Sequence, residues 1–138
     1  MKKLQPLVSP LDFNTSFKSF HYYNVQTFRY NLNMTKKEEI LSYLSTIRAK
    51  LAQDGIEKLG LFGSYADDSA VWGSDIDIVM NTTPRFLEVH PGWEALQTIE
   101  DFRSSLSRHF GGVRVDICDL SGLSETKKEK LLKSAIYV

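Results

Sequence analysis

The sequence predicts an α/β (α+β) fold in which a small mixed β-sheet is flanked by helices. Two observations predict this fold. First, apolar residues recur at helical spacing in three segments, residues 35–54, 93–110 and 125–135. Second, three shorter apolar or alternating segments are typical of strands, residues 56–62, 75–80 and 113–118. Because helix and strand patterns alternate along the chain, they are expected to pack as layers around one core.

Local signals mark the ends of the predicted helices. The first helix has a capping-box pattern, with Thr35 as its N-cap and Glu38 three residues later, and Gly55 ends it. Residues 85–90 are expected to form a loop or a frayed helix. The second long helix has this apolar track: Trp93, Leu96, Ile99, Phe102 or Arg103, Leu106 and Phe110.

Length and composition indicate one globular domain. The chain has 138 residues, of which 42% are hydrophobic and 25% charged, and its formal net charge is zero. A protein that coats nucleic acid or a membrane surface would be expected to carry a basic excess, so neither partner is expected here. The single cysteine, Cys118, excludes an internal disulfide and a cysteine-rich zinc site. No apolar run approaches the roughly 18 residues of a membrane span, and a cytoplasmic protein is expected.

Residues 1–33 differ from the rest of the chain. They are rich in aromatic residues, Ser, Asn and Thr, and no strong periodicity runs through them. Two interpretations stay open. The segment is an N-terminal extension that packs as an arm on the domain or on a partner, or Met34 is the natural start and the preceding stretch is translated upstream sequence. Either interpretation assigns the recognisable domain to residues 34–138.

Two aspartates in the predicted second strand are unfavourable for folding unless they have a function. Asp75 and Asp77 alternate with isoleucines, so both carboxylates point to one face of the strand, about 7 Å apart. Aspartate is depleted in strands, and the two like charges repel each other. A divalent cation such as Mg²⁺, which prefers oxygen ligands, would remove the repulsion. The alternative is a solvent-facing strand whose aspartates are hydrated.

Two further features lie near these aspartates in the predicted fold. Gly63-Ser64 directly follows an apolar strand, where a flexible turn could approach an anion closely. Asp116 is an acid within an otherwise apolar strand, and taken alone it fits equally a buried ion pair with an arginine or a functional carboxylate. If its strand neighbours that of Asp75 and Asp77, three carboxylates converge.

With these motifs the sequence resembles the minimal nucleotidyltransferases of the DNA polymerase β-like superfamily. The resemblance rests on Gly63-Ser64, then Asp75-x-Asp77, then Asp116 between valine and isoleucine. It implies that Gly63 and Ser64 bind the β- and γ-phosphates of a nucleoside triphosphate. It also implies that Asp75, Asp77 and Asp116 ligate two Mg²⁺ ions, and that Asp116 accepts the proton of the attacking hydroxyl.

The resemblance further implies a partner. Small members of this family are commonly the antitoxin of a two-gene pair, and they transfer AMP from ATP to a tyrosine of a helical HEPN-type RNase toxin. The present chain has the matching size, so a hetero-oligomer with such a toxin is expected. This expectation comes from the resemblance and the length, and from no single residue.

The chain departs from the family pattern in one place. Where the family often has Gly-Ser-x-Ala-Arg-Gly, this sequence has Asp67 and Asp68 in place of the arginine and the last glycine. If Asp67 caps a short helix that starts at Ser64, with Asp67 at position N3, the change is harmless. If it points at the phosphates, it weakens nucleotide binding. The alternative function is therefore an inactive antitoxin that neutralises its partner by complex formation.

Overall fold

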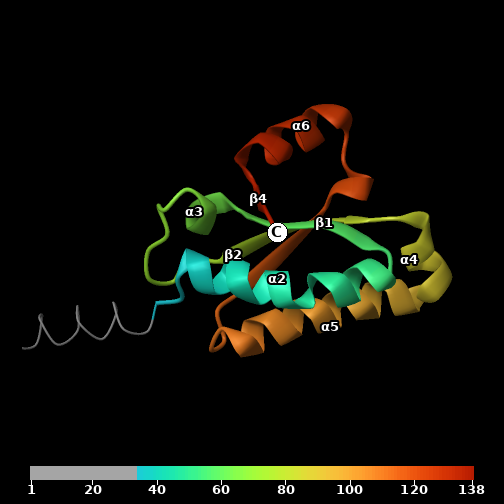
Figure 1. Ribbon diagram of the computed structural model, residues 1–138, viewed down its shortest axis with the longest axis horizontal. Coiled ribbons are helices and arrows are strands. Elements are labelled where there is room, and N and C mark those ends of the chain that lie inside the picture. Colours follow the sequence, from blue (N-terminus) through green and yellow to red (C-terminus); the bar gives the residue numbers. More distant parts are fainter. Residues whose placement is uncertain (1–33) are drawn as a thin grey trace, which may run out of the picture. The chain divides into compact units, whose positions relative to one another are not determined.

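Four strands form one mixed sheet in the order β3-β2-β1-β4 in the computed structural model, which describes residues 34–138 (Figure 1). The elements in chain order are α2 (Lys37–Gln53), β1 (Ile56–Phe62), α3 (Gly63–Ala66), β2 (Ile76–Thr82), α4 (Pro84–Val89), α5 (Trp93–His109), β3 (Val115–Asp119), the 3₁₀ helix η1 (Leu120–Gly122), α6 (Glu125–Ser134) and β4 (Ile136–Tyr137). This architecture confirms the predicted α/β (α+β) class. Within the described range, no helix is both long enough and apolar enough to cross a membrane.

The pairing of β2 with its two neighbours determines which side chains share a face. Strand β1 pairs antiparallel with β2 and with β4, whereas β3 pairs parallel with β2. In the parallel pair, Ile76 lies opposite Val115 and Asp77 lies opposite Asp116. Since side chains alternate between faces, the two aspartates share one face and their apolar neighbours share the other.

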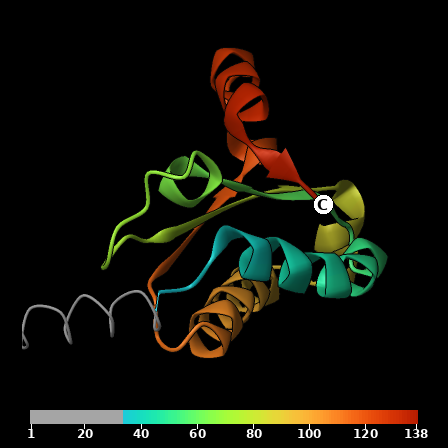
Figure 2. The same ribbon diagram turned by 60° about the vertical axis from the view of Figure 1, so that its left-hand side comes forward.

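The apolar face of the sheet is covered by two helices. Helices α2 and α5 lie side by side on this face, and α6 lies on the other side of the sheet (Figures 1 and 2). The ring of Tyr43 in α2 stacks on His109 in α5, with 3.7 Å between the ring centroids. These core side chains are fully buried: Ile40, Leu44, Leu61, Ile76, Ile78, Met80 and Val115. Each contributes about 1.5–3 kcal/mol by its burial, which stabilises the layer contact.

Several expected elements are confirmed. Strand β1 has the predicted bounds, and Gly55 follows α2 with φ +88°, a conformation that glycine adopts readily. The predicted strand at 75–80 begins at Ile76 and continues to Thr82. Residues 84–89 form the helix α4, with Pro84 in its first turn, so the helical alternative for 85–90 is the correct one.

Two expectations about local structure are wrong, and one strand was missed. The N-cap of α2 is Lys36, whose N–H donates to the Glu39 carboxylate at 3.2 Å, so the predicted pair of Thr35 and Glu38 does not cap this helix. Strand β4 was not predicted, because two residues are too few to show a period. Trp93 and Leu96 are 84% and 59% exposed instead of lying on the buried track of α5. The expectations for residues 1–33 lie outside the described residues.

Candidate active site

The structure brings the three predicted aspartates together on the face of the sheet opposite α2 and α5. Asp77 and Asp116 are direct neighbours across the β2–β3 pair, and Asp75 lies one residue before β2. The backbone N–H of Ile76 donates to the carbonyl oxygen of Arg114 at 2.9 Å, which aligns the entrances to the two strands. The carboxylates of Asp75, Asp77 and Asp116 therefore lie within electrostatic range of one another.

Without a bound cation, the ionised form of the Asp77 carboxyl is unfavourable. Burial raises the pKa of the Asp77 carboxyl, and the negative charges of Asp116 and Asp75 raise this pKa further. The Arg114 guanidinium opposes part of the charge, since its Nε lies 3.7 Å from Asp75 Oδ2 and 3.6 Å from Asp116 Oδ1. The charge density of the cluster is thus only partly compensated by the described residues around it.

The turn after β1 lies directly against Asp77. Phe62, the last residue of β1, pairs with Asp77, and Gly63 follows with φ +69°. A Cβ atom at Gly63 would lie 2.2 Å from Asp77 Oδ2 and 3.0 Å from its Cγ. Glycine is therefore required twice, once for the backbone conformation and once for space beside the carboxylate. The predicted phosphate turn and the predicted metal ligands are adjacent.

The role predicted for Ser64 and Asp67 in the short helix is wrong. Helix α3 begins at Gly63 with Phe62 as its N-cap, so Ser64 lies inside the helix and Asp67 is its C-cap. The carbonyl oxygen of Gly63 accepts the N–H of Asp67 at 3.2 Å, and the positive φ of Gly63 reverses the chain direction at the end of β1. The carbonyl oxygen of Ser64 instead accepts hydrogen bonds from the N–H groups of Ser69 and Ala70, both at 2.9 Å.

Both acids that depart from the family pattern have local partners. The Asp67 carboxylate accepts hydrogen bonds from the hydroxyl and the N–H of Ser69, and these bonds lower the pKa of Asp67. Asp68 pairs with Lys37 of α2, with 2.6 Å between Nζ and Oδ2. Asp67 therefore does not act as the predicted N-terminal capping residue of α3, and neither acid lacks a partner. Each carboxylate is instead engaged by its immediate surroundings.

The donor set fits a divalent cation in its chemistry. Carboxylate oxygens are the ligands that Mg²⁺ prefers, and Gly63 leaves open the space next to Asp77 that a side chain would fill. As the side chains are placed, no three acidic, histidine or cysteine residues of the part described converge closely enough to ligate one ion. Binding a cation through Asp75, Asp77 and Asp116 thus requires side-chain rotation at the site.

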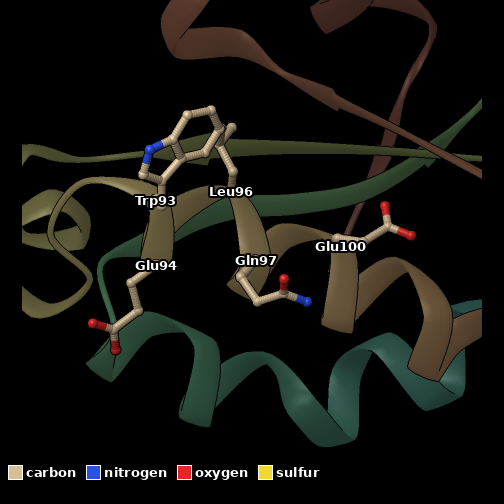
Figure 3. Close-up of a pocket in the computed structure, with 5 residues that line it drawn as sticks. All are labelled: Trp93, Glu94, Leu96, Gln97 and Glu100. Carbon is tan, nitrogen blue, oxygen red and sulfur yellow. The ribbon is translucent and has the colours of Figure 1, made fainter.

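A second surface feature lies on α5, away from these residues. Trp93 and Leu96 project from the first turns of this helix and line an open hollow with three polar residues, Glu94, Gln97 and Glu100 (Figure 3). None of the predicted site residues lines it. Near the site, Arg114 forms the ion pair with Asp116 that the sequence left open as one alternative, although both side chains are at least half exposed instead of buried; its second contact, with Asp75, was not predicted. The signal for Arg114 was its place two residues before Asp116, which puts both side chains on one face.

Comparison with known proteins agrees with this arrangement. Residues 41–138, well over half of the chain, match the family model described as a nucleotidyltransferase domain. The chain is 30% identical over 106 residues to the protein adenylyltransferase MntA of Thermococcus cleftensis, covering 76% of this chain and 98% of that protein. The chain is a nucleotidyltransferase and belongs to the minimal nucleotidyltransferase family.

A solved structure shares the fold. This structure, whose description names a minimal nucleotidyltransferase, superposes with a TM-score of 0.59 at 24% identity, over 75% of this chain and 97% of that chain. This likeness shows the fold alone. Another, described as a toxin–antitoxin crystal structure with AMP-PNP, gives a TM-score of 0.40 at 24% identity over 64% of this chain and 67% of that chain, too low to carry an argument.

Proposed function

We propose that this nucleotidyltransferase transfers AMP from ATP to a tyrosine of a partner protein, a helical HEPN-type RNase toxin, in a reaction that requires Mg²⁺. The observation that carries the proposal is the placement of Asp77 between Asp116 on the neighbouring strand and Gly63 at the end of β1. The name of the Thermococcus relative, a protein adenylyltransferase, supports a protein acceptor. The toxin partner comes from the family resemblance, and the cytoplasmic setting was expected from the sequence.

Each site residue has a role in this reaction. Gly63 and Ser64 hold the β- and γ-phosphates, while Asp75, Asp77 and Asp116 hold two Mg²⁺ ions. The tyrosine oxygen attacks the α-phosphorus, the bond from that phosphorus to its bridging oxygen breaks, and pyrophosphate leaves with the electron pair. Asp116 accepts the phenolic proton. Bound Mg²⁺ supplies charge stabilisation at the attacking and leaving oxygens.

The surroundings of Asp67 and Asp68 favour an active enzyme over an inactive antitoxin that only binds its partner. An inactive antitoxin was suggested by two acids close to the phosphate turn. Because Ser69 engages Asp67 and Lys37 engages Asp68, neither carboxylate depends on the turn for a partner. Their effect on a bound triphosphate is further reduced by their exposure to solvent.

The proposal is tested with the purified protein, Mg²⁺, α-labelled ATP and the product of the adjacent gene. Label is expected on a tyrosine of that product, and Asp77→Asn abolishes it. Asp101→Asn, which removes one exposed carboxylate from α5, serves as the matched control and keeps full labelling. Absence of label with every one of the four nucleotides rejects the enzymatic proposal. Protection of cells by an Asp75→Asn/Asp77→Asn variant would favour the binding alternative.

A further inference from the structure

Arg114 links two of the three clustered aspartates through its guanidinium group. Its Nε lies 3.7 Å from Asp75 Oδ2 and 3.6 Å from Asp116 Oδ1. Asp75 directly precedes β2 and Asp116 lies in β3, so the guanidinium links the start of one strand to its parallel neighbour. The arginine thus lies where a cation bound by both carboxylates would compete with it.

The backbone of Arg114 is held in place more firmly than its side chain. Its carbonyl oxygen accepts a hydrogen bond from the N–H of Ile76 at 2.9 Å, so its backbone is held at the entrance of the sheet. Its side chain is 70% exposed, and both contacts are at ion-pair distance. A long, exposed side chain of this kind can leave the carboxylates at small cost in free energy.

We propose that Arg114 is a positioning residue that occupies Asp75 and Asp116 in the metal-free protein and is displaced when a divalent cation binds. This inference rests on the proposed function, since it assigns the cation to the same carboxylates. In the metal-free protein the guanidinium offsets the repulsion between the aspartates. In the metal-bound protein it is a like charge near the cation and has lost its partners.

Removing the charge of Arg114 therefore has opposite effects on two quantities. The metal-free protein becomes less stable, because the carboxylates lose their counter-charge. The affinity for a divalent cation rises, because no resident charge must be displaced. From the range measured for exposed ion pairs, a rise of roughly two- to tenfold is expected at low ionic strength. This difference shrinks at high salt, where both effects are screened.

The test compares Mn²⁺ binding to the full chain, followed by the electron paramagnetic resonance signal of free Mn²⁺. The informative variant is Arg114→Gln, which keeps the length and polarity of the side chain. The matched control is Arg48→Gln, which removes the same charge from an exposed position on α2, the helix that packs on β1. Thermal unfolding in EDTA gives the second readout and verifies that each variant is folded.

The expected result is tighter Mn²⁺ binding and a lower metal-free melting temperature for Arg114→Gln, with both values unchanged in Arg48→Gln. Equal or weaker Mn²⁺ binding by Arg114→Gln overturns the inference and leaves the proposed function standing, because the parent protein still binds the ion. Absence of Mn²⁺ binding by parent and variants alike overturns both. A melting temperature that rises in Arg114→Gln contradicts the counter-charge role.

Discussion

The contact between Gly63 and Asp77 allows a substitution whose effects on folding and on activity can be separated. In Gly63→Ala, the new Cβ would lie 2.2 Å from Asp77 Oδ2, 3.0 Å from Cγ and 3.2 Å from the Asp77 Cβ. Ordinary contacts of this kind are about 3.5 Å or longer, so the Asp77 carboxylate must move by roughly 1 Å. The residue also keeps φ +69°, which costs alanine about 1–2 kcal/mol.

Gly111→Ala is the matched control for the backbone cost. Gly111 has φ +70°, and a Cβ there would meet nothing within 4 Å. From the backbone conformation, both variants are expected to lose about 1–2 kcal/mol of stability, which corresponds to a fall of roughly 5–10 °C in melting temperature for a domain of this size, and the overlap with Asp77 adds to this loss in Gly63→Ala. Only Gly63→Ala displaces a side chain of the site.

Activity is expected to separate the two variants. A misplacement of about 1 Å at a reacting centre costs on the order of a hundredfold in rate, and metal ligation tolerates only about 0.2 Å. Gly63→Ala is therefore expected to lose nucleotide transfer by about a hundredfold or more, and Gly111→Ala by less than about twofold. Calorimetry and labelling with α-labelled ATP measure the two effects. Transfer by Gly63→Ala within twofold of the control would refute the reasoning.

Three further substitutions test the electrostatics and the sheet. Asp77→Asn is expected to stabilise the metal-free protein at pH 7, because the raised pKa of Asp77 means that its ionised form disfavours folding. Urea unfolding measures this gain in stability, which should disappear as the pH falls through the raised pKa. Burial opposes ionisation of Asp119, but hydrogen bonds from Thr82 overcome it and lower the pKa of Asp119. At pH values above the ordinary aspartate pKa near 3.9, Asp119→Ala is therefore expected to lower the free energy of unfolding by about 1 kcal/mol. The unfolding curves of parent and variant should converge as the pH falls through the lowered pKa of Asp119. Gly60→Ala would place a Cβ 2.7 Å from the carbonyl oxygen of Ile136 and is expected to release β4, costing about 1–3 kcal/mol, with faster hydrogen exchange at residues 136–138; unchanged exchange would contradict this contact.

The strands were predictable where burial imposes a local pattern. In β1 an apolar run from Leu59 to Phe62 allowed the strand to be predicted, although Glu57 and Lys58 before it are exposed and interrupt the regular pairing with β2. The pairing of β3 with β2 is a different kind of fact, since it joins segments nearly forty residues apart. Periodicity shows that Asp77 and Asp116 each lie on the polar face of a strand. It does not show that the two strands are neighbours, which is why the sequence left this point conditional.

The errors arose where several local interpretations have similar energies. On α5, the residues that face the core are Ala95, Ile99, Phe102 and Leu106. Alanine is too weakly hydrophobic to mark the start of this stripe in the sequence. Larger residues suggested a stripe through Trp93 and Leu96, which the structure leaves exposed. At α3, a serine after a glycine is a common cap, yet the carbonyl oxygen of Gly63 already accepts the N–H of Asp67 at 3.2 Å, so the helix begins one residue earlier.

The core face of the sheet determines the geometry of the polar face. Ile76 and Ile78 are fully buried against the helices, and their pairing with Val115 and Ile117 sets the register of β2 and β3. A slip by one residue would turn every apolar side chain to the wrong face, at about 1.5–3 kcal/mol for each side chain. Two carboxylates about 5 Å apart repel by roughly 1–3 kcal/mol at effective dielectric constants of 80 to 20. The burial energy of several side chains exceeds this repulsion, so the fold holds Asp77 beside Asp116 before any cation binds.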